Sequence, residues 1–148
     1  MTNQNDNKTK RMLITGATGG MGRASAVLAA KEGYQLILAD LSAGKLAALA
    51  TECAEAGATV DCQVLDVTKA SDIENLCAVA KNGGIDAIIH TVGISPTMAG
   101  WEKIIEVDLI STVKFLEAIR PDLNVGCGVV CITSMSAYLA PPNPELEN

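Results

Sequence analysis

Short apolar runs alternate with longer amphipathic stretches along the whole chain. Five runs rich in Val, Ile and Leu have the length and composition of β-strands. Between them, apolar residues recur at the spacing of helices that bury one face. The pattern predicts strands at about residues 11–15, 35–40, 58–65, 85–91 and 128–133, and helices from Gly20 to Glu32, Ser42 to Gly57, Ser71 to Gly83 and Trp101 to Ile119.

Local signals mark the helix ends and the faces that we expect to be buried. Ser42 is a predicted N-cap, and Ser71-Asp72-Ile73-Glu74 has the form of a capping box. Glycines end the first three helices, and Pro121 ends the last. The expected inner positions are Leu46, Leu49 and Cys53 in the second helix, Ile73, Leu76, Cys77 and Ala80 in the third, and Ile104, Ile105, Leu109, Thr112 and Leu116 in the last.

The alternation of strands and helices predicts an α/β fold with a parallel sheet. Right-handed crossovers between five parallel strands give a doubly wound sheet, a Rossmann fold, with strand order 3-2-1-4-5. Ligands bind such sheets at the carboxyl ends of strands one and four, where the order reverses. We expect residues 11–148 to form this one domain and the polar residues 1–10 to form a disordered tail.

Composition and charge exclude several kinds of partner. The 148 residues carry a net charge of −6, which disfavours nucleic acid and anionic membranes. No apolar run approaches the roughly 18–20 residues that span a bilayer, and the amino terminus lacks the apolar core of a signal peptide. The five cysteines form no Cys-x-x-Cys pair. We therefore expect free thiols in a reducing cytoplasm and no metal site.

The segment from Thr15 to Gly22, TGATGGMG, follows the first strand and opens the first helix. Glycines allow a tight turn and a close approach of the backbone, and the N–H groups of the helix then point at a pyrophosphate. Asp40 ends the second strand, where a carboxylate accepts hydrogen bonds from an adenosine ribose and disfavours a 2′-phosphate. This favours NAD over NADP, although Arg23 adds a positive charge nearby. The candidate cofactor-binding residues here are Gly16, Thr18, Gly19, Gly20, Met21, Gly22, Asp40 and Leu41.

Together these motifs resemble those of the short-chain dehydrogenase/reductase family, over residues 11 to about 140. The glycine loop is similar to the family's TGxxxGxG motif, and Asp66-Val67 is similar to the Asp-Val that contacts adenine. A role of Asp66 as a turn residue is equally open. His90-Thr91-Val92-Gly93 stands where the family has Asn-Asn-Ala-Gly and retains the last glycine. The resemblance implies that Thr91, Val92 and Gly93 border the cofactor, whereas His90 is interpreted as a polar residue at the strand end.

The resemblance also implies a chemistry, hydride transfer between a nicotinamide cofactor and an alcohol or ketone. Ser134 matches the family's catalytic serine, and Asp108 stands where the family has the asparagine of its catalytic tetrad. The family's Tyr-x-x-x-Lys motif is absent, because neither Tyr34 nor Tyr138 has a lysine four residues further on. The chain therefore resembles the amino-terminal part of a longer enzyme and is expected to be inactive alone. The chain resembles members that have an insertion between the catalytic serine and tyrosine, such as hydroxysteroid-dehydrogenase-like enzymes, in which the tyrosine would lie beyond Asn148.

Two other functions stay open. A non-catalytic dinucleotide-binding module needs neither the tyrosine nor the lysine, and the TGxxGxxG spacing resembles the family's extended branch of nucleotide-sugar epimerases and dehydratases. The apolar strand at 128–133 lacks charge and proline, so alone it would be an unprotected sheet edge. We expect a further carboxyl-terminal part, or a second copy in a homo-oligomer, to cover that edge.

Overall fold

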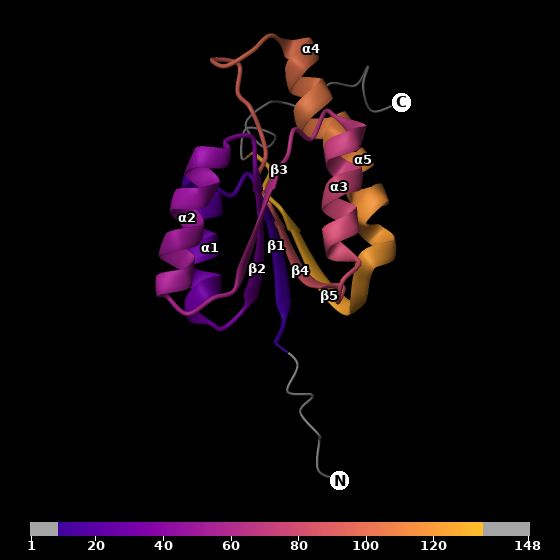
Figure 1. The fold of residues 1–148 in the computed structure, drawn as a ribbon. Coiled ribbons are helices and arrows are strands. Elements are labelled where there is room, and N and C mark those ends of the chain that lie inside the picture. Colours follow the sequence, from indigo (N-terminus) through magenta and orange to yellow (C-terminus); the bar gives the residue numbers. More distant parts are fainter. Residues whose placement is uncertain (1–8, 135–148) are drawn as a thin grey trace.

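The computed structural model describes residues 9–134, which build one parallel sheet (Figure 1). The strands run in the order β3-β2-β1-β4-β5, and every pairing is parallel. This confirms the doubly wound order expected from the sequence. Most of the predicted tail, and Tyr138, lie outside the described residues. The strands are β1 (Arg11–Thr15), β2 (Gln35–Asp40), β3 (Val60–Val64), β4 (Ile85–His90) and β5 (Leu123–Cys131).

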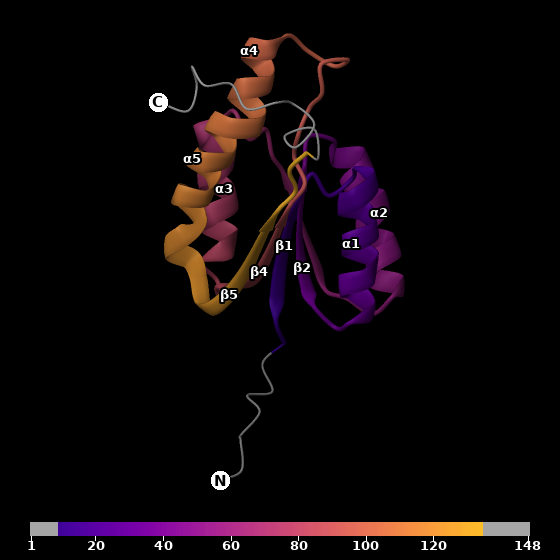
Figure 2. The same cartoon turned by 180° about the vertical axis from the view of Figure 1, so that it is seen from behind.

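Helices cover both faces of the sheet (Figures 1 and 2). One face carries α1 (Gly20–Lys31) and α2 (Ala43–Glu55), and the other carries α3 (Ala70–Ala80) and α5 (Thr112–Ile119). Because side chains alternate along a strand, Ile14 belongs to the core under α1 and α2, whereas Leu13 belongs to the other. Within residues 9–134, no helix has the length and apolar character needed to cross a membrane.

The helical segment between β4 and β5 differs from the predicted one. It consists of α4 (Trp101–Ile104), the π-helical η1 (Ile105–Ser111) and α5, and a 3₁₀ turn, η2 (Arg120–Asp122), follows. The predicted inner face is wrong at Ile105 and Leu109, which are 43% and 60% exposed. The prediction assumed the period of a regular α-helix, and the wider turn of a π-helix moves the buried face. The buried residues are instead spaced by four: Val107, Ser111, Phe115 and Ile119.

The start of α3 also differs from the prediction. Lys69 occupies its N-cap position, and no side chain caps the helix, so the predicted capping box is wrong. Ser71 donates instead to Asp72, at 3.2 Å. The carboxylate of Asp72 accepts the backbone N–H of Asp66 at 3.0 Å. The acid in the first turn therefore closes the loop after β3, at the positive end of the helix dipole.

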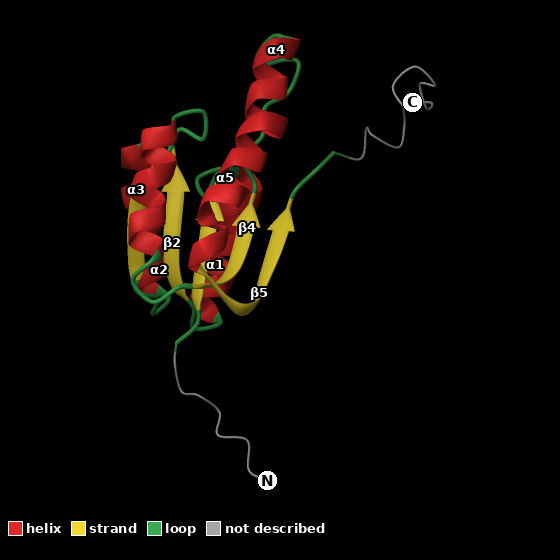
Figure 3. Ribbon diagram, turned by 90° about the vertical axis from the view of Figure 1, so that its right-hand side faces the viewer, coloured by secondary structure: helices red, strands yellow, loops and turns green. Residues whose placement is uncertain are grey.

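β5 is the outermost strand of the sheet in Figure 3 and pairs with β4 alone among residues 9–134. It begins at Leu123, before the predicted range, because its pairing with β4 passes through an irregularity between Leu123 and Gly128. Gly126 lies within this irregularity with a φ of 84°, which glycine adopts without strain. The exposed apolar side chains of the strand include Val129 and Val130.

Candidate functional site

The carboxyl ends of β1, β2 and β4 place the glycine loop beside the chain that follows β4. Gly16 has a φ of 69°, and a Cβ there would lie 2.7 Å from the hydroxyl oxygen of Thr91 and 2.9 Å from the backbone nitrogen of Val92. A Cβ on Gly22 would overlap the carbonyl oxygen of Gly16. These two glycines are therefore required by packing within the chain, since any side chain there would push backbone apart.

The amino end of α1 has the features that favour an anion at a helix start. Gly19 is its N-cap, but no side chain caps the helix and no acid lies in its first turn. The first amides of an α-helix have no partner inside the helix, and together with the helix dipole they attract an anion. A Cβ on Gly20 would meet nothing within 4 Å, and Met21 is 56% exposed. Gly20 and Met21 thus border open space at a helix start.

Asp40 joins the end of β2 to this loop. Its carboxylate accepts the backbone N–H of Thr18 at 2.9 Å and that of Leu41 at 2.7 Å. Asp40 is half-buried and Leu41 is exposed. A carboxylate has about four acceptor positions, so two backbone contacts leave capacity for hydroxyl donors such as those of a ribose.

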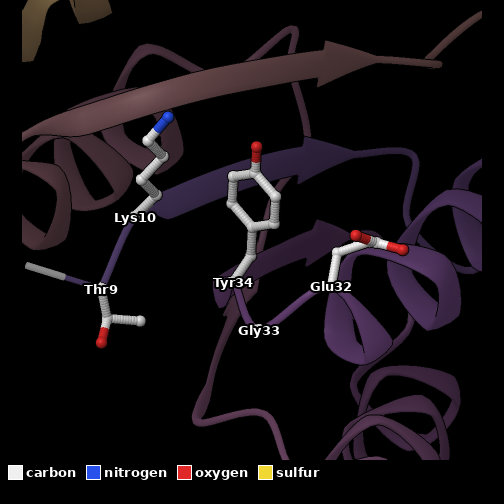
Figure 4. A pocket seen from close by; sticks show the side chains of 5 residues that line it. All are labelled: Thr9, Lys10, Glu32, Gly33 and Tyr34. Atoms are coloured by element: carbon white, nitrogen blue, oxygen red, sulfur yellow. The ribbon is translucent and has the colours of Figure 1, made fainter. Parts of the chain in front are cut away.

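Two hollows lie near opposite ends of the sheet. One of about 490 Å³ is lined by Thr9, Lys10, Glu32, Gly33 and Tyr34 (Figure 4), next to the amino ends of β1 and β2. The other, about 330 Å³, lies between α1 and α2 and is lined in part by Thr18. Because doubly wound sheets bind ligands at the carboxyl ends of their strands, we assign the site to the end that contains Thr18.

Asp66 and Val67 follow β3 on the same edge of the sheet. Asp66 accepts from the hydroxyl and the backbone N–H of Thr68, at 2.7 and 3.0 Å, and lies 3.7 Å from the Lys69 ammonium. The hydroxyl contact is the main reason why the pKa of Asp66 lies below its ordinary value. Val67 is buried in the core under α3 and α5. Asp66 thus makes the contacts of a turn residue, and its expected role toward adenine stays a prediction.

The chain after β4 is held from both sides. The Thr91 hydroxyl lies 2.9 Å from the carbonyl oxygen of Thr15 and 3.1 Å from that of Gly16, so its single proton is shared between them. On the other side, Asp108 of η1 accepts the backbone N–H of Ile94 at 2.9 Å. Val92 and Gly93 lie between these two contacts. Asp108 therefore has a contact that positions the loop, which sequence reasoning did not anticipate.

His90 is almost fully buried, 2% exposed, at the end of β4. Its Nδ1 lies 2.6 Å from the hydroxyl of Thr15, and its Nε2 lies 3.0 Å from the hydroxyl of Thr112. The ring stacks on Phe115 with a centroid separation of 5.2 Å. Burial lowers the pKa of His90, so the ring is neutral near pH 7 and connects β1, β4 and α5. Sequence reasoning missed Thr112 as its partner.

Ser134 is the last described residue and is exposed. It follows β5 at the carboxyl edge of the sheet, where Ile132 still donates to the carbonyl oxygen of His90 at 3.0 Å. The predicted catalytic serine and the glycine loop thus lie along the same edge. This common edge follows from the parallel pairing of the strands, and the roles of the individual residues stay predictions.

Comparison with known proteins agrees with the geometry. The family model described as short chain dehydrogenase matches residues 10–143. Dehydrogenase/reductase SDR family member 4 of Sus scrofa is 28% identical over 92% of this chain and 53% of its own length. A short-chain dehydrogenase/reductase of Brucella melitensis, titled glucose/ribitol dehydrogenase, has a TM-score of 0.80 and 29% identity over 89% of this chain and 59% of its own. A NAD⁺-bound xylitol dehydrogenase has a TM-score of 0.79 and 25% identity, over 90% of this chain and 56% of its own.

The chain spans about half the length of the curated relatives that it matches. The matched part nevertheless includes the whole described sheet, from β1 to β5. On this evidence, the chain belongs to the short-chain dehydrogenase/reductase family.

Proposed function

We propose that this chain is the cofactor-binding part of an oxidoreductase that transfers a hydride between NAD and an alcohol or ketone. The observation that carries the proposal is the uncapped amino end of α1 beside the Asp40 carboxylate. An anion-binding helix start next to a hydroxyl acceptor matches the two ends of a diphosphate–ribose unit. The five cysteines are free thiols, which favours a reducing compartment such as the cytoplasm.

Each element of the site has a distinct task in this proposal. The amides of Gly20, Met21 and Gly22 bind the pyrophosphate, while Asp40 accepts from the ribose hydroxyls. A bound nicotinamide cofactor supplies or accepts the hydride. Thr91 fixes the glycine loop through the carbonyl groups that it contacts.

Five further predicted residues complete this assignment. Asp66 and the backbone of Val67 border the adenine. Val92 and Gly93 border the nicotinamide half of the cofactor, and Asp108 positions their loop through the Ile94 amide. The family resemblance implies that Asp66, Val67, Val92 and Gly93 contact the cofactor and that Asp108 stands in the place of the tetrad asparagine, whereas the positioning of the loop by Asp108 rests on its contact with Ile94.

Ser134 is the proposed contact for the substrate oxygen. Proton transfer to that oxygen needs a positioned acid or base, and no Tyr-x-x-x-Lys occurs in the 148 residues. We therefore propose that the complete active site includes residues from beyond this chain. A non-catalytic dinucleotide-binding module is the second candidate, because such a module does not need the Tyr-x-x-x-Lys motif that these 148 residues lack. The nucleotide-sugar branch is a third, favoured by the presence of both Gly19 and Gly20.

Calorimetric titration of the purified chain with NAD⁺ and NADP⁺ tests the proposal. We expect NAD⁺ to bind more tightly than NADP⁺. Asp40→Asn should narrow the difference between the two affinities, because asparagine keeps an acceptor for the Thr18 amide but removes the charge near the 2′ position. Asp61→Asn is the matched control, since Asp61 is an exposed acid near the amino end of β3. Equal or tighter binding of NADP⁺ to the unchanged chain would contradict the assignment.

A further inference from the structure

The hollow between α1 and α2 contains charges that the proposed function does not use. Its lining consists of Thr18, Arg23, Lys45, Ala48, Leu49 and Glu52. The backbone N–H of Thr18 donates to Asp40, so this hollow adjoins the carboxylate that we assign to the ribose. A group attached at the ribose 2′ position would therefore enter a space bordered by two cations and one further carboxylate.

The two cations of this hollow differ in their contacts. Arg23, in the first turn of α1, forms an ion pair with Glu52 of α2, in which Nη2 lies 2.6 Å from Oε1. The side chains are 58% and 36% exposed. Lys45 forms no ion pair with any residue of the range 9–134. Glu52 thus holds the guanidinium toward α2 and neutralises it.

We propose that Glu52 determines cofactor specificity by holding Arg23 away from the 2′ position of the adenosine ribose and cancelling its charge. The inference rests on the proposed binding of a dinucleotide. A phosphate monoester carries a charge of about −1.5 to −2 near pH 7, and a guanidinium fork matches its oxygens in a bidentate geometry. While Glu52 is charged, Arg23 is engaged in this ion pair and its guanidinium is not available to a 2′-phosphate.

The expected effect is modest because the ion pair is exposed. Exposed pairs contribute little in water and are screened by salt. Replacing Glu52 by glutamine should therefore tighten the binding of a 2′-phosphate by about threefold to fivefold at low ionic strength, and by less at physiological salt. The affinity for NAD⁺, which has a hydroxyl at that position, should hardly change.

Calorimetry on the full 148-residue chain can isolate this effect. The probes are NAD⁺, NADP⁺ and the pair of fragments 5′-AMP and 2′,5′-ADP, which differ by the 2′-phosphate alone. We expect Glu52→Gln to increase the affinity ratio of NADP⁺ to NAD⁺, and that of 2′,5′-ADP to 5′-AMP. Glu55→Gln is the matched control, because it removes the same charge from an exposed position of the same helix.

A double-mutant cycle with Arg23→Met tests whether Glu52 acts through Arg23. In the Arg23→Met background, Glu52→Gln should lose most of its effect on both ratios. The role of Glu52 is overturned if Glu52→Gln leaves the ratios unchanged, if Glu55→Gln changes them equally, or if the effect persists without Arg23. Failure of the unchanged chain to bind either dinucleotide would instead overturn the proposed function, and with it the inference.

Discussion

Lowering the pH from about 7.5 to about 5.5 should destabilise this fold through one buried group, His90. In the unfolded chain the imidazole has its ordinary pKa of 6.5, and in the folded chain burial lowers that pKa. Below pH 6.5 the unfolded chain therefore binds a proton that the folded chain excludes. The contribution of His90 to the free energy of unfolding therefore has its full value above pH 6.5. It decreases as the pH falls from 6.5 to the pKa of His90 in the folded chain.

The magnitude follows from the proton count. A single proton that binds only to the unfolded chain lowers the free energy of unfolding by at most about 1.4 kcal/mol for each pH unit below 6.5. His90 has hydroxyl partners at both ring nitrogens, Thr15 and Thr112, and its pKa is lowered by the loss of hydration on burial. No ionised partner therefore compensates a charge on the ring. We expect the free energy of unfolding to decrease by up to about 1.4 kcal/mol over this interval.

Urea denaturation at both pH values, on the unchanged chain and on His90→Asn, measures this difference. Asparagine cannot titrate, so the variant should be less stable at both pH values but should lose little further stability at the lower one. Thr112→Val keeps the imidazole and should keep most of the pH dependence. The same decrease in His90→Asn as in the unchanged chain would refute the reasoning, as would an NMR titration that gives His90 a folded pKa of 6.5 or above.

Three other outcomes are expected. Gly22→Ala should lower the free energy of unfolding by about 1–3 kcal/mol in urea denaturation, because its Cβ would overlap the Gly16 carbonyl oxygen. Gly20→Ala should fold normally but bind NAD⁺ less well in calorimetry. Equal stability of the two variants would contradict the distinction between a packing glycine and a ligand-contacting one. The purified, mass-verified chain should oxidise no alcohol with NAD⁺, because it lacks Tyr-x-x-x-Lys; robust NADH formation would refute this. β5 should pair with later sequence or a second copy, so the dilute monomer should show fast hydrogen exchange at its outward-facing amides, and lasting protection there without a partner would show that the edge argument is wrong.

The strands of this fold could be predicted well because their signal is local. β1 and β2 lie between two helical layers and are apolar at every position except their first and last. Their observed bounds coincide with the predicted ones. The segment after β4 could not be predicted in the same way. Ile105 and Leu109 are as apolar as the buried Val107 and Phe115, so periodicity cannot tell which set faces the sheet. Only the π-helical turn of η1, which depends on tertiary packing, decides the buried face.

The candidate site also combines features that the sequence predicts with contacts that it does not. The glycine loop and Asp40 carry short-range signals, a turn before a helix and an acid at a strand end, and both lie where the sequence predicted them. The contacts that position them link residues far apart in the chain, such as Thr15 with His90 and Arg23 with Glu52. Such pairs depend on strand order and on how two helices pack, so a single sequence offers no signal for them.

Three glycines of the TGATGGMG loop, Gly16, Gly20 and Gly22, are of two kinds, and the distinction changes what the motif indicates. Gly16 and Gly22 are required by contacts inside the chain, with Thr91 and with the loop's own backbone. They would be needed even if the loop bound nothing. A Cβ on Gly20 would meet nothing within 4 Å, at a helix start whose amides no side chain caps. The fold gives no reason for a glycine at that position, whereas a ligand in contact with the backbone does. The case for a dinucleotide therefore rests on Gly20 and Asp40 more than on the motif as a whole.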